Sequence, residues 1–151
     1  MPDINDLKSI IMLTYLEDYM LEKIAKITKI KEYRAGDYIF NEGDEAKNVY
    51  AVVDGKVGLE IEKNSSTRIF FKHINKGMTF GFCALVDIED KSYMDSAKAL
   101  SDTKLFIWNT EDLEALFFQD CEMGFLFMKR IAKIIKTRLQ VRNIQFLDIY
   151  K

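Results

Sequence analysis

The stretch Arg34-Ala-Gly-Asp-Tyr-Ile-Phe-Asn-Glu-Gly-Asp-Glu-Ala-Lys-Asn-Val-Tyr-Ala-Val-Val-Asp-Gly-Lys-Val57 decides how this chain is expected to fold. Three glycines in it each stand beside an aspartate and separate two runs of strand-forming residues. The glycines are Gly36, Gly43 and Gly55, and the runs are 38–40 and 49–53. Glycine reaches positive φ at little steric cost, and an aspartate side chain bonds nearby backbone amides, so such pairs favour tight turns. The stretch therefore predicts short antiparallel strands joined by tight turns, as in a jelly roll or barrel.

Strand patterns continue on the C-terminal side of this stretch as far as Trp108. Residues 57–62 alternate apolar and polar side chains, the period of two that is typical of a strand with one buried face. The turn-forming run Asn64-Ser65-Ser66 lets residues 68–74 pair back on them as a hairpin. Residues 104–108 form the last predicted strand, so we expect roughly eight strands over residues 33–108.

Helical patterns flank this β-rich region on both sides. In residues 4–30 apolar side chains recur at intervals of three and four, and a second helical region, residues 110–150, follows Asn109 and Thr110, either of which can cap it. We therefore predict an α+β, mainly β fold: a double-stranded β-helix of the jelly-roll or cupin-like kind, flanked by N-terminal helices and a long C-terminal helix. Residues 1–151 contain no linker or repeat and are expected to form one domain.

The composition excludes several classes of protein. The chain has 151 residues, 48% of them apolar and 30% charged, and its net charge of −2 creates no overall field toward nucleic acid or membrane. No apolar run approaches the ~18 residues of a spanning helix, and Asp3 and Asp6 stand where a signal peptide carries basic residues. Cys83 and Cys121 are far apart, so reduced thiols and a cytoplasmic location are expected.

Residues suited to catalysis or metal binding are scarce. His73 is the single histidine, and the sequence has no Ser-His-Asp, Cys-His or metal-spaced cluster. We expect no catalytic residue, no metal site and no enzyme activity.

The last helix carries two apolar stripes. Two stripes predict that one face meets the β-roll while the other meets the same helix of a second subunit, giving a homodimer. The alternative is one wide apolar face buried within its own domain. The first stripe consists of Met128, Ile131, Ile135, Leu139 and Phe146, and the second of Phe127, Ile134 and Val141.

The same helix is basic. Because no aromatic interleaving or groove-reading motif accompanies the charge, we interpret it as a solvated face whose aliphatic stems cover apolar neighbours. The basic residues are Lys129, Arg130, Lys133, Lys136, Arg138 and Arg142.

Several short motifs occur in the order and spacing of a known family. They are Leu21-Glu22-Lys23-Ile24-Ala25 in the first helical region, then Gly36-Asp37, Glu42-Gly43-Asp44, Val49-Tyr50 and Asp54-Gly55-Lys56-Val57, and finally Gly77-Met78-Thr79-Phe80-Gly81. Together they resemble the cyclic-nucleotide-binding domains of catabolite activators and kinase regulatory subunits, over most of the chain. The resemblance implies a signalling or regulatory module that acts as a ligand sensor.

The resemblance also implies where a ligand would bind, in a phosphate-binding cassette. Responsive members read Phe-Gly-Glu-Leu/Ile-Ala-Leu there, and Pro-Arg-Ala/Thr/Ser-Ala follows after a short loop. The ribose 2′-hydroxyl donates to the Glu, the Arg binds the cyclic phosphate, and backbone amides of a short helix supply further contacts. This chain reads Phe80-Gly81-Phe82-Cys83-Ala84-Leu85 and then Ser92-Tyr93-Met94, so Phe82 replaces the Glu and Tyr93 the Arg. We predict that it does not bind cyclic AMP or cyclic GMP in the usual way.

Two interpretations of this altered cassette stay open. Phe82, Tyr93 and Met94 make it apolar and aromatic, which suits a small uncharged molecule or a cyclic nucleotide held atypically. The same side chains can instead plug the site and leave a scaffold for dimerisation or protein interaction, and we favour this second interpretation. Cys83 is either a redox-sensitive thiol or, as we favour, a small apolar filler.

The end of the sequence adds a last expectation. Family members of the activator type continue into a helix-turn-helix after the long helix, whereas this sequence stops at Lys151. We therefore expect a stand-alone sensor or adaptor that needs no cofactor, has no DNA reader of its own and does not enter a membrane. Its expected partner is a second copy of itself, and a different protein partner stays open.

Overall fold

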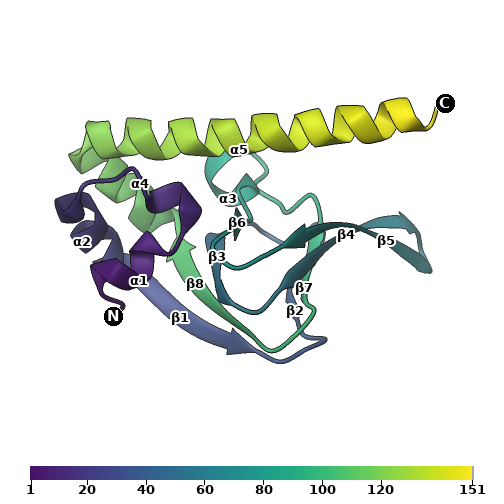
Figure 1. Ribbon diagram of the computed structural model, residues 1–151, viewed down its shortest axis with the longest axis horizontal. Helices are drawn as coiled ribbons and strands as arrows, with labels where there is room; N and C mark the ends of the chain where they lie inside the picture. The colour runs from purple at the N-terminus through teal and green to yellow at the C-terminus, as the bar shows by residue number, and fades with distance from the viewer. Residues whose placement is uncertain (151) are drawn as a thin grey trace.

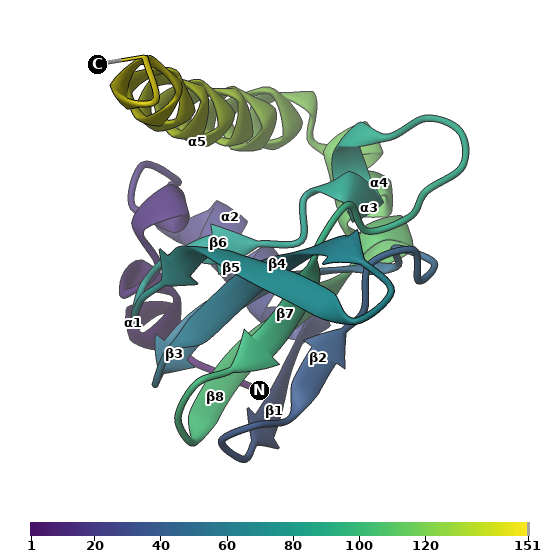
Figure 2. The same cartoon turned by 90° about the vertical axis from the view of Figure 1, so that its right-hand side faces the viewer.

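Two antiparallel four-stranded sheets form a β-roll in the computed structural model, which describes residues 1–150. The strands are β1 (Thr28–Tyr33), β2 (Tyr38–Phe40), β3 (Asn48–Asp54), β4 (Val57–Asn64), β5 (Thr67–Ile74), β6 (Thr79–Phe80), β7 (Ser96–Ala99) and β8 (Thr103–Asn109). One sheet has the order β1-β8-β3-β6 and the other β2-β7-β4-β5. Because chain neighbours such as β2 and β3 lie in different sheets, the chain crosses repeatedly between the two layers (Figures 1 and 2). This arrangement confirms the predicted, mainly β fold class.

The turns of the roll depend on glycine where the sequence predicts it. Gly55 joins β3 to β4 at a φ of +95°, and a Cβ at this position would lie 2.6 Å from both the Asp102 carbonyl oxygen and the Thr103 hydroxyl. Gly36 has nearly the same φ, +94°, but a Cβ there would meet no atom within 4 Å. Gly55 is therefore required for both its backbone conformation and its lack of a side chain, and Gly36 only for its conformation.

The predicted hairpin over residues 57–74 is present as β4 and β5. Val57 pairs with Ile74 at its base, and the Asn64 side-chain oxygen accepts from the Ser66 amide in the turn. The β4 strand also pairs with β7, so the hairpin is anchored to the roll along one edge only.

Trp108 ties the sheet to the helices that precede it. The side chain is fully buried, and its indole N–H donates to the Thr28 hydroxyl at 2.7 Å. That hydroxyl in turn donates to the Ile24 carbonyl at 2.6 Å. The chain of two hydrogen bonds connects β8, the first residue of β1 and the end of helix α2, and it satisfies every polar group involved.

The N-terminal region is broken into three short segments: α1 (Ile4–Lys8), the 3₁₀ helix η1 (Ile11–Leu13) and α2 (Asp18–Ile27). The prediction of one helical region over residues 4–30 was therefore wrong in two respects. The region is divided into three helical segments, and the roll begins at Thr28 rather than near residue 33. The apolar residues at intervals of three and four are still buried, because each of the three segments packs its own apolar side chains against a shared core. Residues 28–33 follow tertiary pairing with β8 instead of the preceding helical period.

Three further helices follow in the second half of the chain: α3 (Cys83–Val86), α4 (Thr110–Gln119) and α5 (Cys121–Asp148). The Asn109 side chain caps α4 by accepting from the amides of Glu111 and Asp112, as its position in the sequence predicts. The Asp120 side chain caps α5, and α5 runs along one side of the roll with its C-terminal end extending away from the N-terminal helices (Figure 1). In residues 1–150 no helix has both the length and the apolar character that crossing a membrane requires.

Alanine at Gly55 should cost more stability than alanine at Gly36. Both variants place a Cβ at positive φ, a strain of about 1–2 kcal/mol, and Gly55→Ala adds an overpacking cost of about 1–3 kcal/mol. The free energy of unfolding from urea denaturation measures the difference. Equal losses for the two variants would show that the contacts around Gly55 do not constrain the turn.

Candidate functional site

The cassette, which we define as residues 80–95, begins where β6 ends. Gly81 turns the chain at a φ of +83°, and a Cβ there would lie 3.0 Å from the Tyr50 ring and 3.3 Å from the Asn48 carbonyl oxygen. The tight approach lets the short helix α3 start immediately against β3. Gly81 therefore fixes where the cassette leaves the sheet and where α3 begins.

Phe82, which the sequence resemblance aligns with the family's Glu, is buried beside Arg138 of α5. The side chain is 7% exposed, and the Arg138 guanidinium carbon lies 5.4 Å from the centroid of its ring. Arg138 also donates to the Thr79 carbonyl at 2.8 Å, which fixes α5 beside β6. A cation facing an aromatic ring is favourable, more so when both groups are partly withdrawn from water. The ring of Phe82 is thus buried in the fold and faced by a cation from α5.

Tyr93, which the sequence resemblance aligns with the family's Arg, belongs to the interior of the roll. The side chain is 4% exposed, and its ring stacks on that of Phe40 with centroids 3.7 Å apart and planes 12° from parallel. The Tyr93 hydroxyl donates to the Asn48 carbonyl at 2.7 Å and accepts from the Asn48 amide at 3.2 Å. Burial raises the pKa of Tyr93 well above its ordinary value, so the phenol stays neutral.

The backbone beside Tyr93 is equally constrained. Its amide donates to the Asp44 carbonyl at 3.0 Å, and its carbonyl accepts from the Gly43 amide at 2.8 Å. Glu45 and Ser92 form an isolated antiparallel bridge one residue further along. The loop is consequently held against the segment between β2 and β3, the same glycine-containing stretch that predicts the fold.

The remaining predicted pocket residues do not converge on one space. Phe80 and Ala84 are fully buried in the core, whereas Met94 is 65% exposed and points away from it. Leu85 lines a cavity of about 390 Å³ beside α3, α4 and α5, and neither that cavity nor one of about 330 Å³ beside η1 is lined by Phe82 or Tyr93.

Cys83 shows no sign of an activated thiol. Burial is the largest influence on it and raises the pKa of the thiol, with a backbone hydrogen bond at Met94 opposing that shift. Redox-sensitive cysteines have a lowered pKa, because the thiolate is the reactive form. The surroundings of Cys83 therefore favour its interpretation as an apolar filler.

Lysines near the cassette are committed elsewhere. The Lys91 ammonium lies 3.3 Å from a Glu114 carboxylate oxygen on α4, and the Lys98 ammonium lies 5.5 Å from the centroid of the Tyr38 ring. Both ammonium groups therefore have partners of their own, on α4 and at Tyr38.

Arg138 is a residue beside the cassette that the sequence interpretation missed, because it was assigned to a solvated face. It lies on α5 four residues after the half-buried Ile134 and seven after the buried Ile131, so helical periodicity already places it on the side facing the roll. Burial lowers the pKa of Arg138, and the negative charge of Asp95 opposes that shift.

Asp95 is the acidic group that faces Arg138. Burial raises the pKa of Asp95 to about 6, Glu42 adds to the shift, and the charges of Arg138 and Arg142 oppose it. Arg138 and Arg142 of α5 therefore place positive charge near the cassette, and the Asp95 carboxylate partly neutralises it.

The predicted dimer residues fall on two sides of α5. Phe127 and Ile131 are 1% exposed and pack in this chain's own core, so they are not free to meet a second subunit. Met128 and Ile134 are half-buried. Ile135, Leu139 and Val141 are exposed, by 45%, 58% and 41%.

An outer stripe of α5 keeps four residues of the first predicted stripe, of which Met128 is half-buried, and adds Phe125 and Ala132. Its members recur at spacings of three, four, three, four and seven, the heptad period of a coiled coil. They are Phe125, Met128, Ala132, Ile135, Leu139 and Phe146. Phe125, which the two predicted stripes did not include, is 65% exposed.

The raised pKa of Asp95 predicts an inverse dependence of stability on pH. The folded chain binds the proton more tightly than the unfolded chain, so the carboxylate destabilises the fold above pH 6 and the penalty disappears as the pH falls toward 4. Asp95→Asn should raise the free energy of unfolding at pH 7.5 by about 1 kcal/mol after solvent screening, and by less at pH 4.5. Glu89→Gln, which removes an exposed carboxylate of the same loop, is the control. A gain that grows with falling pH would contradict the assignment.

Comparison with known proteins agrees with this geometry. The sequence profile of the cyclic nucleotide-binding domain family matches residues 30–120. The chain is 30% identical over 134 residues to an anaerobic regulatory protein of Bacillus subtilis, covering 83% of this chain and 51% of that protein. It is 26% identical over 139 residues to the neuropathy target esterase sws of Drosophila willistoni, covering 89% of this chain and 9% of the esterase. The chain therefore spans about half of the first relative's length and a small part of the second.

A solved structure extends the likeness to nearly the whole fold. The crystal structure of a putative cyclic nucleotide-binding protein from Geobacter metallireducens superposes with a TM-score of 0.79 at 24% sequence identity, covering 92% of this chain and 99% of that one. The family match covers more than half of the sequence and includes β1 to β8 almost completely. The chain belongs to the cyclic nucleotide-binding domain family.

Proposed function

We propose that this chain is a non-enzymatic regulatory module that does not hold cyclic AMP or cyclic GMP through the family's charged contacts. The observation that carries the proposal is the placement of Tyr93. The residue at the arginine position is stacked on Phe40 and bonded twice to the backbone of Asn48, so it fills the roll instead of facing a ligand.

The energy needed to open this position supports the proposal. Moving Tyr93 aside gives up an aromatic stack worth about 0.5–1.5 kcal/mol and two hydrogen bonds worth about 1 kcal/mol each. A ligand that paid this cost of about 3 kcal/mol would bind more than about a hundredfold more weakly. The contact to a phosphate that an arginine provides is absent in addition, so the cassette favours a plugged site over an open apolar pocket.

The non-enzymatic part of the proposal rests on the family and on the available chemistry. The esterase relative matches this chain over only 9% of its own length. The single histidine, His73, lies on β5 with its ring 4.5 Å from that of Phe70. One histidine in an aromatic contact leaves little material for general acid–base catalysis.

Calorimetry with cyclic nucleotides tests the proposal. We expect no binding of cyclic AMP or cyclic GMP to the unaltered chain at ligand concentrations up to about 1 mM. The double variant Phe82→Glu with Tyr93→Arg should bind at least about tenfold more tightly, because it restores both charged contacts. Phe82→Gln with Tyr93→Gln loses the same packing without the charges and is the matched control, with the fold of each variant checked by circular dichroism. Micromolar binding to the unaltered chain would overturn the proposal.

We also propose that the outer stripe of α5 joins two copies of this chain. The stripe has the heptad spacing of a helix pair, and Leu139 and Phe146 in it are 58% and 57% exposed. The helix lies along the roll with its other face already occupied, and Figure 2 shows it standing outside the two sheets. Lys129 and Lys136 flank the stripe with like charges, so salt should strengthen the pairing by screening their repulsion.

A single substitution with a matched control tests this dimer. Ile135→Glu places a charge on the stripe and should give a monomer in sedimentation velocity at tens of micromolar. Ile144→Glu is nine residues further along the same helix, which at about 100° per residue puts it on the opposite side, and it should stay dimeric. A monomeric mass for the unaltered chain at this concentration, in low and in high salt, would contradict the proposal.

A further inference from the structure

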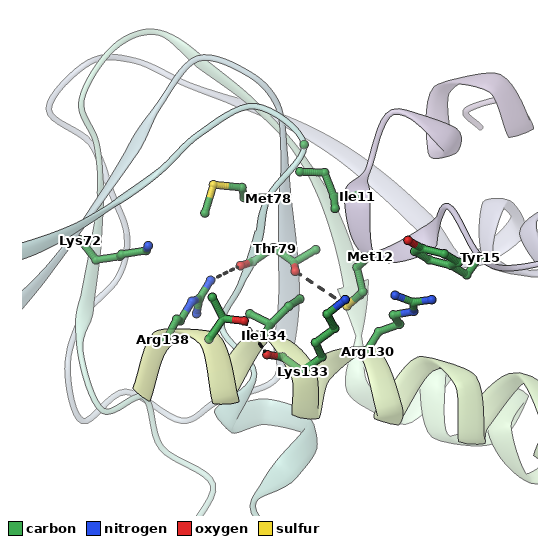
Figure 3. Close-up of a pocket in the computed structure, with 12 residues that line it drawn as sticks. Ile11, Met12, Tyr15, Lys72, Met78, Thr79, Arg130, Lys133, Ile134 and Arg138 are labelled. Carbon is green, nitrogen blue, oxygen red and sulfur yellow. Dashed lines mark hydrogen bonds between the residues drawn. The ribbon is translucent and has the colours of Figure 1, made fainter. Parts of the chain in front are cut away.

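A cavity of about 330 Å³ lies between α5, η1 and the segment that leads into β6 (Figure 3). Its apolar wall includes Ile11 and Met12 of η1, Met78 beside β6 and Ile134 of α5. The volume is at the lower end of the range found for small-molecule sites. The cavity is separate from the altered cassette, because none of residues 80–94 lines it.

Positive charge exceeds negative charge around this cavity, where Asp95 opposes only the charge of Arg138. Lys72 on β5 and Arg130, Lys133 and Arg138 on α5 all line it, and no aspartate or glutamate does. Within residues 1–150, no carboxylate oxygen lies within 4.0 Å of a charged nitrogen of these four residues. Figure 3 shows Lys133 reaching from α5 toward η1 and Lys72 pointing inward from the other side. The excess is local, because the whole chain carries a net charge of −2.

The two arginines already have partners in the fold, and for Arg138 these include the nearby charge of Asp95, so the lysines are the cations that a ligand would meet. The Arg130 guanidinium carbon lies 3.1 Å from the centroid of the Tyr15 ring, and Arg138 donates to the Thr79 carbonyl. Both arginines are therefore held in place at the cavity wall. They contribute positive potential there, and an anion would relieve the repulsion among the four charges.

A buried hydroxyl adds a polar group to the cavity wall. The Thr79 side chain is 2% exposed, and its hydroxyl donates to the Met12 sulfur at 3.8 Å. A thioether is a weak acceptor, so a carboxylate oxygen in the cavity would be a better partner for this hydroxyl. Met12 and Met78 are flexible, polarizable side chains that adapt to the shape of an apolar ligand.

We propose that this cavity binds a small amphipathic anion: a carboxylate, recognised by Lys133 and the Thr79 hydroxyl, on an aliphatic body that lies against Ile11, Met78 and Ile134. The apolar wall disfavours a bare inorganic anion, which would lose hydration without covering this surface. The cations disfavour an uncharged apolar molecule, which would leave them unpaired. The site extends the proposed function by giving this module a ligand position that does not depend on the cassette.

Octanoate is a suitable probe, with two reference compounds that divide its chemistry. Acetate carries the carboxylate without the aliphatic body, and octan-1-ol carries the body without the charge. In calorimetry on the full chain we expect octanoate to bind with a Kd on the order of 100 μM. Acetate and octan-1-ol should each bind at least about tenfold more weakly. The affinity for octanoate should fall as salt concentration rises, because the cations are partly open to solvent.

Charge variants locate the site. Lys133→Gln should weaken octanoate binding about fivefold to tenfold, whereas Lys136→Gln, on the same helix but away from the cavity, should leave it unchanged. Ile11 is 61% exposed, so Ile11→Glu can add a carboxylate to the wall without disturbing the core. Binding should be lost in Ile11→Glu and largely kept in Ile11→Gln, which has the same size without the charge.

Several results would overturn the inference. Equal affinity for octanoate and acetate would reduce the site to a simple anion site, and equal affinity for octanoate and octan-1-ol would remove the role of the cations. Octanoate binding that Lys133→Gln and Ile11→Glu leave unchanged would place the ligand elsewhere, and no binding at 1 mM would leave the cavity without this function. Each of these outcomes is independent of whether the cassette binds a cyclic nucleotide.

Discussion

Two hydrogen bonds between the Tyr93 hydroxyl and the backbone of Asn48 connect the cassette to strand β3 of the first sheet. Asn48 begins β3, the strand on which the first sheet is built, and Tyr93 ends the cassette loop. A family arginine at position 93 would need a ligand or water for its charge, whereas a neutral phenol is satisfied inside the roll. Tyr93 therefore joins the core, although its neighbours Ser92 and Met94 stay exposed.

The helix α5 carries both of the surfaces proposed to bind something else, a ligand and a second copy of the chain. Its buried side packs Phe127 and Ile131 into the core, an adjacent side carries Lys133 and Ile134 to the cavity, and the outer side presents Leu139. A helix rotates by about 100° per residue, so these surfaces follow from one continuous sequence. Because a packed helix moves as a rigid body, a ligand beneath it and a partner outside it would act on the same element.

The parts of this structure that local chemistry controls were predictable from the sequence. The glycine turns at Gly36 and Gly55, the hairpin over 57–74 and the cap at Asn109 each depend on residues within a few positions of one another. The start of β1 at Thr28 was not predictable in that way, because the hydroxyl that ends α2 takes its partner from Trp108, eighty residues away. Long-range pairing overrides a helical period whenever it satisfies more of the buried groups.

The same distinction between local and long-range contacts applies to the candidate sites. The sequence indicates that Phe82 and Tyr93 make the cassette apolar and uncharged. Whether these two side chains leave an open pocket depends on the residues that pack on them. Phe40, which stacks on Tyr93, lies more than fifty residues away in the sequence, so this contact was not predictable. For the basic residues of α5 the sequence suggested no site, although the structure places several of them at a cavity. A charged helix face looks solvated in a sequence, since aliphatic stems and exposed ammonium groups are its usual state. In the structure η1 lies opposite Lys133, so the basic face of α5 forms one wall of a cavity and η1 forms another. The apolar and charged character of the cavity depends on both walls together.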